Sequence, residues 1–303
     1  MNDAQGQADT WIHGFLDRHR LPESYMEVAT NYLEPLASLI ADRAKQKGST
    51  LLLGVNGSQG SGKSTLCDYL VDCLSARHEL NAIALSLDDF YLTKAERERL
   101  AEDVHPLLVT RGVPGTHDMP LLSDTLDALQ SSAASVGVPR FDKSVDDRYE
   151  RSGWSEIDTP VDVVLLEGWC MGARGDDAET LARPLNSLES EEDADGVWRS
   201  YTDAALRKAY APVFARMDLW VMLCAPGFEQ VLRWRTEQEE KLRAAVDGLG
   251  DGLMDDVALA RFVAHYERHT RQCLRQLPQD VDVLLRLDSE RRIVESRGLP
   301  ETS

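Results

Sequence analysis

The nine residues Gly57–Thr65 constrain the fold of this chain more than any other segment. They read Gly-Ser-Gln-Gly-Ser-Gly-Lys-Ser-Thr, follow the apolar run Leu51–Val55, and precede apolar residues that recur at helical spacing from Leu66 onward. A Gly-x-x-x-x-Gly-Lys-Ser pattern between a strand and a helix indicates a loop whose backbone N–H groups bind phosphate at the positive end of the helix. A Gly- and Ser-rich turn that only caps a helix is the alternative, and the strand context and the Lys-Ser-Thr ending disfavour it.

The loop motif predicts particular roles for its side chains. Lys63 is expected to reach the β- and γ-phosphates of a nucleotide, and Ser64 to bind Mg²⁺ through its hydroxyl group. The cofactors predicted from the loop are therefore ATP and Mg²⁺. The residues expected to bind the nucleotide are Gly57, Ser58, Gln59, Gly60, Ser61, Gly62, Lys63, Ser64 and Thr65.

Short apolar runs rich in β-branched residues recur along the chain and are separated by helical or loop-rich stretches. Strands with such wide spacing indicate βαβ crossovers, so the sequence predicts an α/β fold with a parallel sheet. Two helices, broken at Leu21-Pro22-Glu23, are expected before the first strand. The five expected strands are Leu51–Val55, Ala82–Leu87, Val161–Leu166, Leu219–Leu223 and Val281–Leu287.

Two acidic residues follow predicted strands and are candidates for the chemistry. Asp88 follows the second strand, where a carboxylate would lie at the carboxyl edge of the sheet beside the phosphate loop, and it is the candidate general base and a possible Mg²⁺ ligand. Glu167 ends the third strand in a pattern that resembles a Walker B element and is expected to bind Mg²⁺ directly or through water. The alternatives are that Asp88 or Asp89 caps the helix near Lys94 and that Glu167 is only a turn residue.

Composition excludes several classes of function. The net charge of −19 makes a general nucleic-acid or anionic-membrane surface unfavourable, so an anionic substrate needs a local basic pocket. The five cysteines are scattered without metal-binding spacing, which favours reduced thiols in a cytoplasmic protein. Neither a leader at the N-terminus nor a run of about 18 apolar residues is present, so export and membrane insertion are not expected.

Three further segments are informative, and two of them have two interpretations each. Residues 105–151 mix turn formers with basic residues and are expected to contact the acceptor, although ordinary surface ion pairs explain the composition equally well. The acidic run Glu189–Asp195 is expected to be a solvated loop. The stretch around Arg233 and Arg235 is a helix that serves either as a lid or as an exposed helix stabilised by i,i+4 ion pairs such as Arg235–Glu239.

The ordered set of motifs resembles the D-glycerate 3-kinase family, and more distantly pantothenate, uridine and phosphoribulose kinases. The motifs are Leu-Asp-Asp-Phe-Tyr, Arg-Gly-Val-Pro-Gly-Thr-His-Asp, Pro-Arg-Phe-Asp-Lys-Ser-x-Asp-Asp-Arg and Leu-Leu-Glu-Gly-Trp-Cys-Met-Gly. The resemblance implies a P-loop kinase with a five-stranded sheet of order 2-3-1-4-5 that transfers the γ-phosphate of ATP to the 3-hydroxyl of D-glycerate. It implies that Asp88 is the base, that Arg233 and Arg235 belong to a lid, and that the acceptor is surrounded by Asp89, Tyr91, Arg111, His117, Asp118, Lys143 and Arg148.

The same phosphate machinery serves other functions, and the sequence leaves them open. Pantothenate, a nucleoside or another hydroxy acid is an alternative acceptor, and a nucleotide-switch NTPase is a function of another class. The expected organisation is N-terminal helices over 1–48, a kinase domain over 49–297 with an acceptor-site insertion at about 105–151 and a lid at about 227–245, and a tail over 298–303. Monomer and homodimer both remain possible.

Overall fold

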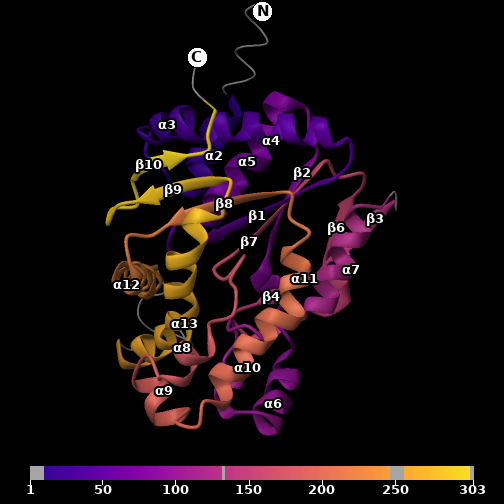
Figure 1. Ribbon diagram of the computed structural model, residues 1–303. Coiled ribbons are helices and arrows are strands. Elements are labelled where there is room, and N and C mark those ends of the chain that lie inside the picture. The colour runs from indigo at the N-terminus through magenta and orange to yellow at the C-terminus, as the bar shows by residue number, and fades with distance from the viewer. Residues whose placement is uncertain (1–9, 132–133, 246–255, 301–303) are drawn as a thin grey trace, which may run out of the picture.

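The computed structural model describes residues 10–131, 134–245 and 256–300, and its centre is a six-stranded sheet with helices on both faces (Figure 1). The strand order is β10-β9-β8-β1-β7-β2, and every pairing except that of β9 with β10 is parallel. The five parallel strands therefore have the predicted order 2-3-1-4-5. The bounds are β1 (Leu51–Gly57), β2 (Ala82–Ser86), β7 (Val163–Gly168), β8 (Leu219–Cys224), β9 (Val283–Leu287) and β10 (Ile293–Arg297).

The sixth strand corrects the prediction of a five-stranded, wholly parallel sheet. Strand β10 pairs antiparallel with β9 at the edge of the sheet and contains a register shift between Ile293 and Glu295. All of its residues after Ile293 are exposed, so the strand lacks the apolar run by which the other strands were recognised. Short, charged strands are typical of sheet edges because they discourage pairing with another chain.

Helices cover the two faces of the sheet, and the sheet separates two apolar cores. On one face α2 (Thr10–His19), α4 (Glu34–Lys47), α5 (Lys63–His78) and α12 (Phe228–Ala245) share a core with Leu53 and Val55 of β1. On the other face α7 (Met119–Leu129) and α11 (Ala211–Phe214) pack near Leu52 of the same strand. The alternation of Leu52 and Leu53 between the cores is that of a strand buried on both sides.

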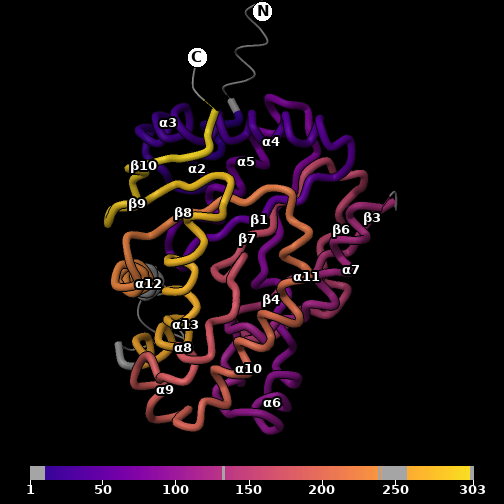
Figure 2. Tube along the Cα trace, in the orientation of Figure 1, coloured from indigo at the N-terminus to yellow at the C-terminus, as the bar shows by residue number. Residues whose placement is uncertain are grey.

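Two helices lie beside the strands β8 and β9. The chain trace shows α12 and α13 (Asp256–Gln276) next to each other on that side of the sheet (Figure 2).

The remaining elements are α3 (Tyr25–Val28), η1 (Ala29–Leu33), η2 (Leu87–Phe90), α6 (Lys94–Asp103), η3 (Pro106–Val109), β3 (Ser135–Val138), β4 (Phe141–Asp142), β5 (Asp147–Arg148), η4 (Arg151–Gly153), β6 (Ser155–Asp158), α8 (Ala178–Ala182), α9 (Ser187–Glu192), α10 (Val197–Ala205), η5 (Leu206–Tyr210) and η6 (Leu277–Gln279). In the described part of the chain, no helix combines the length and apolar character needed to cross a lipid bilayer.

The acidic run Glu189–Asp195 is solvated only in part, which corrects the sequence interpretation at its two buried residues. Its first half belongs to α9, and the side chains of Glu189 and Asp193 are both 1% exposed. Glu189 accepts hydrogen bonds of 2.8 and 2.6 Å from Arg268, while Asp193 pairs at 2.9 Å with the buried Arg199. A buried carboxylate is tolerated only with such partners.

We expect Arg268→Ala to lower the free energy of unfolding by about 3 kcal/mol, because the substitution leaves buried carboxylates unpaired. The Arg268 side chain is 5% exposed and also lies 3.5 Å from the buried Asp176. Urea unfolding followed by circular dichroism measures the loss. Arg183→Ala is the control, since Arg183 is 76% exposed and its pair with Glu179 should contribute less than about 0.5 kcal/mol. Equal losses for the two variants would contradict the prediction.

Candidate active site

The phosphate loop has the geometry that its glycines allow. Gly60 and Gly62 adopt φ angles of 76° and 90°, and helix α5 begins directly after the loop at Lys63. A Cβ atom at Gly57 would lie 2.6 Å from the Ser61 hydroxyl, so the chain is too tight there for a side chain. The hydroxyl groups of Ser58 and Ser61 are buried without a hydrogen-bond partner in the described part of the chain, and a bound phosphate would supply acceptors for both.

Parallel pairing brings the predicted acidic residues to the loop. Glu167 of β7 lies in register with Val55 of β1 and with Ser86 of β2. Ser86 precedes Asp88 by two residues in the chain. Because the carboxyl ends of parallel strands meet at one edge of the sheet, this register gathers the loop and both acids at a single position.

Ser64 and Glu167 form the part of the site that would hold Mg²⁺. The Ser64 hydroxyl donates a 2.9 Å hydrogen bond to Glu167 Oε1, and Lys63 Nζ lies 3.7 Å from Glu167 Oε2. The Oε2 atom is buried and accepts no hydrogen bond from the residues that the structure describes. Among the described residues no group of three or more His, Cys, Asp or Glu side chains could hold a metal ion. Two protein oxygens beside a phosphate loop fit Mg²⁺, which takes its other ligands from water and phosphate.

Two hydrogen-bond donors orient the carboxylate of Asp88. The Tyr91 hydroxyl donates a 2.6 Å hydrogen bond to Asp88 Oδ1, and Lys143 Nζ donates one of 2.6 Å to Oδ2. Burial raises the pKa of Asp88, but Lys143, Lys63 and the two hydrogen bonds outweigh burial and lower the pKa to about 2. Helix α6 is capped by Thr93, so neither Asp88 nor Asp89 serves as its cap.

A cavity of about 490 Å³ joins the phosphate loop to these acids. It is lined by four cationic and three acidic side chains together with polar and aromatic groups, so it is polar although the whole chain is strongly acidic. The lining residues are Gln59, Gly60, Lys63, Ser64, Ser86, Asp88, Asp89, Tyr91, Arg111, Lys143, Glu167, Trp169, Arg235, Phe262 and Tyr266.

Asp89 and Arg111 line the cavity while their charged groups are held by neighbouring residues. Asp89 accepts hydrogen bonds of 2.9 Å from Arg140 and 3.1 Å from the Phe141 backbone N–H. Arg111 pairs with Asp146, and its guanidinium lies over the Phe141 ring, 5.5 Å from the centroid. The two side chains therefore fix the strand at Phe141 against this cavity.

Three residues predicted to contact the acceptor lie outside the cavity lining. The His117 ring packs against Tyr91 at 4.7 Å, and its Nδ1 lies 2.6 Å from the Tyr210 hydroxyl. Burial lowers the pKa of His117 to about 4, so the ring is neutral at physiological pH and offers no charge to an anion. Asp118 caps α7 through a 3.0 Å bond to the Leu121 N–H and pairs at 3.0 Å with Arg148.

The two lid candidates face different ways. Arg235 lines the cavity, with its guanidinium 5.8 Å from the centroid of the Phe262 ring on α13. Arg233 is 56% exposed and lies near Glu237 and Glu290, as expected of an ordinary surface residue. The expected pair Arg235–Glu239 depends on a Glu239 side chain that lies outside the described residues.

A residue that the sequence did not indicate contacts the phosphate loop. Arg291, in the β9–β10 connection, donates a 2.8 Å hydrogen bond to the Gly60 carbonyl and a second of 2.8 Å to Glu237 of α12. Its guanidinium lies 5.1 Å from the ring centroid of Trp234. Trp234 also packs closely against the loop, because a Cβ atom at Gly60 would lie 2.8 Å from Trp234 Cβ. No motif surrounds Arg291, so only the folded chain reveals its position beside the loop.

We expect Arg291→Ala to raise the KM for ATP about tenfold with a smaller change in kcat, because the loss of a charged hydrogen bond frees the Gly60 carbonyl. Steady-state kinetics at varied ATP measure the effect. Arg292→Ala is the matched control, since Arg292 is 75% exposed and its side chain pairs with Asp288 on the surface. The prediction is wrong if both variants keep the wild-type KM.

Comparison with known proteins found no match among protein-family models, but two relatives are informative. Uncharacterized kinase mug58 of Schizosaccharomyces pombe is 33% identical over 247 residues, which cover 77% of this chain and 84% of the relative. The chloroplastic D-glycerate 3-kinase of Arabidopsis thaliana is 30% identical over 226 residues, which cover 71% of this chain. The match covers 46% of the plant enzyme, so this chain spans about half of its length.

A solved structure shows the same fold. D-glycerate 3-kinase from Cryptococcus neoformans var. grubii matches with a TM-score of 0.72 and covers 88% of this chain and 99% of its own. The sequence identity is 24%, so this likeness speaks for the fold alone.

Proposed function

We propose that this chain, which belongs to the family of P-loop kinases that includes D-glycerate 3-kinase, transfers the γ-phosphoryl group of ATP to the 3-hydroxyl of D-glycerate. The observation that carries the proposal is the position of Asp88. Its carboxylate lies in the same cavity as Lys63, Ser64 and Glu167, where it can meet an acceptor hydroxyl beside the phosphate loop.

The geometry supports phosphoryl transfer by positioning and electrostatics. Lys63 is placed to contact the transferring phosphoryl group, while Ser64 and Glu167 would hold Mg²⁺, which neutralises phosphate charge when bound. Asp88, with a pKa of about 2, is ionised at physiological pH and accepts the hydrogen bond of the acceptor hydroxyl. A weak base suffices because the hydroxyl proton is transferred late in a loose transition state.

The charge of the acceptor side supports a small hydroxy acid as the acceptor. Lys143, which is 59% exposed, and Arg111 bring positive charge next to Asp88 in a chain of net charge −19. These cations can bind a carboxylate. Aromatic residues also line the cavity, but Arg235 lies over the Phe262 ring, and Trp169 and Tyr266 meet edge to face with centroids 4.9 Å apart. These contacts occupy one face of the Phe262 ring and one face within the Trp169–Tyr266 pair, which leaves less aromatic surface for stacking of a nucleoside.

An acceptor panel tests the substrate. ADP release is measured with Mg-ATP alone and with D-glycerate, L-glycerate, pantothenate or uridine. We expect kcat/KM for D-glycerate to exceed that for uridine, which lacks a carboxylate, by at least about 100-fold, since a site built to bind a polar group rejects analogues that lack it. We also expect it to exceed the values for L-glycerate and pantothenate. A higher kcat/KM for pantothenate or uridine would contradict the glycerate proposal and leave the kinase proposal intact. Equal ADP release with and without every acceptor identifies a nucleotide-switch NTPase instead.

A further inference from the structure

Arg97 of α6 is a buried charge outside the candidate active site. Its side chain is 1% exposed, and it is not one of the residues that line the cavity at the phosphate loop. A buried guanidinium is costly to the fold unless protein groups pair with it and accept its hydrogen bonds. The partners of Arg97 therefore indicate what this charge contributes.

The guanidinium of Arg97 joins three separate stretches of backbone. Its Nε donates a 3.3 Å hydrogen bond to the Leu92 carbonyl, Nη1 donates one of 2.7 Å to the Val109 carbonyl, and Nη2 donates one of 2.6 Å to the Asp146 carbonyl. These carbonyls belong to the segment before α6, to the end of η3 and to the turn between β4 and β5. Because the donors of a guanidinium point in fixed directions, Arg97 sets the spacing of the three segments.

The carboxylate of Asp146 extends this arrangement to the cavity. Arg97 Nη2 lies 3.0 Å from Asp146 Oδ2, and the other carboxylate oxygen accepts a hydrogen bond from Nη1 of Arg111, which lines the cavity. The backbone of Arg111 is held separately, because the Tyr266 hydroxyl donates a 2.8 Å hydrogen bond to its carbonyl. Arg97 therefore acts on the direction of the Arg111 side chain, whose guanidinium keeps further N–H donors beside the one that Asp146 accepts.

The ring of Phe141 is a second link between Arg97 and the cavity. The guanidinium groups of Arg97 and Arg111 lie 6.0 and 5.5 Å from the centroid of this ring. Phe141 begins β4, and Lys143 of the turn that follows also lines the cavity. Arg97 thus contacts the hairpin on both sides of Lys143, at Phe141 and at Asp146.

We propose that Arg97 is a positioning residue for the acceptor. Without touching the acceptor, it holds Asp146 and the turn so that Arg111 and Lys143 direct their charges to the acceptor carboxylate. This inference rests on the proposed function, in which the acceptor carries a carboxylate. The nucleotide end of the cavity, at Lys63, is built on α5 and not on the segments that Arg97 joins, so ATP binding should not depend on Arg97.

Arg97→Lys tests this role, because lysine keeps the charge but lacks the three-way donor geometry of a guanidinium. The KM for D-glycerate should rise about tenfold, as expected for the loss of a charged hydrogen bond, while the KM for ATP should change less than about twofold. Steady-state kinetics with either substrate varied measure the two values. In an Arg111→Gln background the same substitution should raise the KM for D-glycerate less than about threefold, because residues that act through one another are not additive.

Asp146→Asn interrupts the same link at a position where the fold tolerates the change. The Asp146 side chain is 37% exposed, and its φ of 58° is one that asparagine adopts readily. The amide keeps the shape of the side chain but loses the charge that pairs with both arginines. The KM for D-glycerate should rise about fivefold, again with an unchanged KM for ATP.

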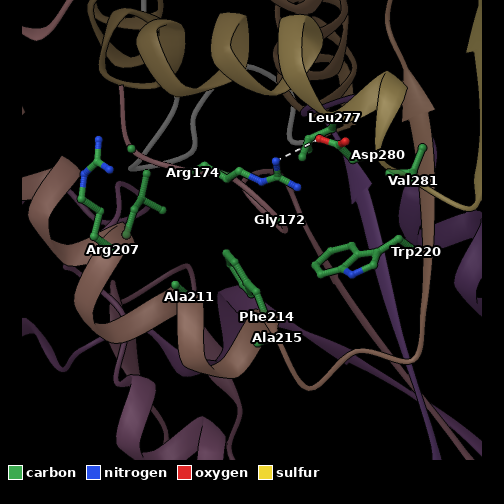
Figure 3. Close-up of a pocket in the computed structure, with 13 residues that line it drawn as sticks. Gly172, Arg174, Arg207, Ala211, Phe214, Ala215, Trp220, Leu277, Asp280 and Val281 are labelled. Carbon is green, nitrogen blue, oxygen red and sulfur yellow. Dashed lines mark ion pairs between the residues drawn. The ribbon is translucent and has the colours of Figure 1, made fainter. Parts of the chain in front are cut away.

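Arg199→Lys is the matched control. The Arg199 side chain is 4% exposed, donates a 2.8 Å hydrogen bond to the Leu181 carbonyl and pairs at 2.9 Å with Asp193, but it does not line the cavity. Its urea unfolding midpoint should fall as in Arg97→Lys, while the KM for D-glycerate stays at the wild-type value. Arg174→Gln is a second control, at a separate cavity of about 520 Å³ where Arg174 pairs at 3.0 Å with Asp280 (Figure 3). It should leave both KM values unchanged.

Four results would overturn the inference. Equal increases of the KM for D-glycerate in Arg97→Lys and Arg199→Lys would show that loosening of the fold is sufficient. An unchanged value in both Arg97→Lys and Asp146→Asn, or an equal increase of the KM for ATP, would exclude positioning of the acceptor. An increase in Arg174→Gln would place the acceptor carboxylate in the other cavity. Failure of the proposed function is distinguishable from these results, because the wild type itself would then release no additional ADP with D-glycerate.

Discussion

Asp88→Asn is expected to lower kcat between about 100-fold and 10,000-fold while the dissociation constant of ATP changes little. The amide keeps the size of the side chain and an oxygen for the Tyr91 hydroxyl, but it cannot accept the proton of the acceptor hydroxyl. Single-turnover kinetics, with nucleotide binding measured separately, distinguish loss of chemistry from loss of binding.

Asp127→Asn is the matched control for the Asp88 prediction. The Asp127 side chain is 66% exposed and pairs with Arg216, far along the chain from the phosphate loop and outside the cavity lining. It should leave kcat unchanged. If Asp88→Asn retains more than about a tenth of the wild-type kcat, Asp88 is not the base, because general base catalysis contributes at least about 100-fold.

Lys63→Ala is expected to lower kcat about 1,000-fold and to weaken ATP binding as well, since it removes a cation that stabilises the transferring phosphoryl group. The Lys63 side chain is 17% exposed and lies at the first residue of α5, 3.7 Å from Glu167 Oε2. Steady-state kinetics with varied ATP and D-glycerate measure both effects.

The control for the Lys63 prediction is Lys94→Ala, an exposed lysine at the start of α6 that does not line the cavity. Its kinetic constants should match those of the wild type. A Lys63→Ala variant with wild-type kcat would show that the loop binds nucleotide without taking part in transfer.

The sequence predicted the parts of the molecule that local pattern determines. Leu51–Val55 and its neighbouring glycines identify a strand and a phosphate loop, because only such a run places backbone N–H groups at the start of a helix. The order of the five parallel strands followed from the family resemblance, and the register of Val55 and Ser86 with Glu167 then brings the acids to the loop. The sequence did not identify β10, whose charged and exposed residues resemble a loop.

The sequence could not predict contacts that the fold makes between distant segments. Glu189 was expected in solvent because Arg268, its partner, is 79 residues away in the chain. His117 was expected near the acceptor from the family resemblance, and the structure adds that its ring packs against Tyr91 and Tyr210 and that burial lowers its pKa, which keeps it neutral. Arg291 reaches the Gly60 carbonyl across 231 residues. In each case the tertiary partner decides the role of the side chain, and composition near the residue carries no trace of it.

The most direct test of the central claim is the identity of the phosphorylated product. The protein is incubated with Mg-ATP and D-glycerate, and the products are followed by phosphorus NMR alongside ADP release. We expect one 3-phospho-D-glycerate to form for each ADP, and product formation to be lost in Asp88→Asn. ADP release without any phosphorylated acceptor, or phosphate attached to the 2-hydroxyl, would contradict it.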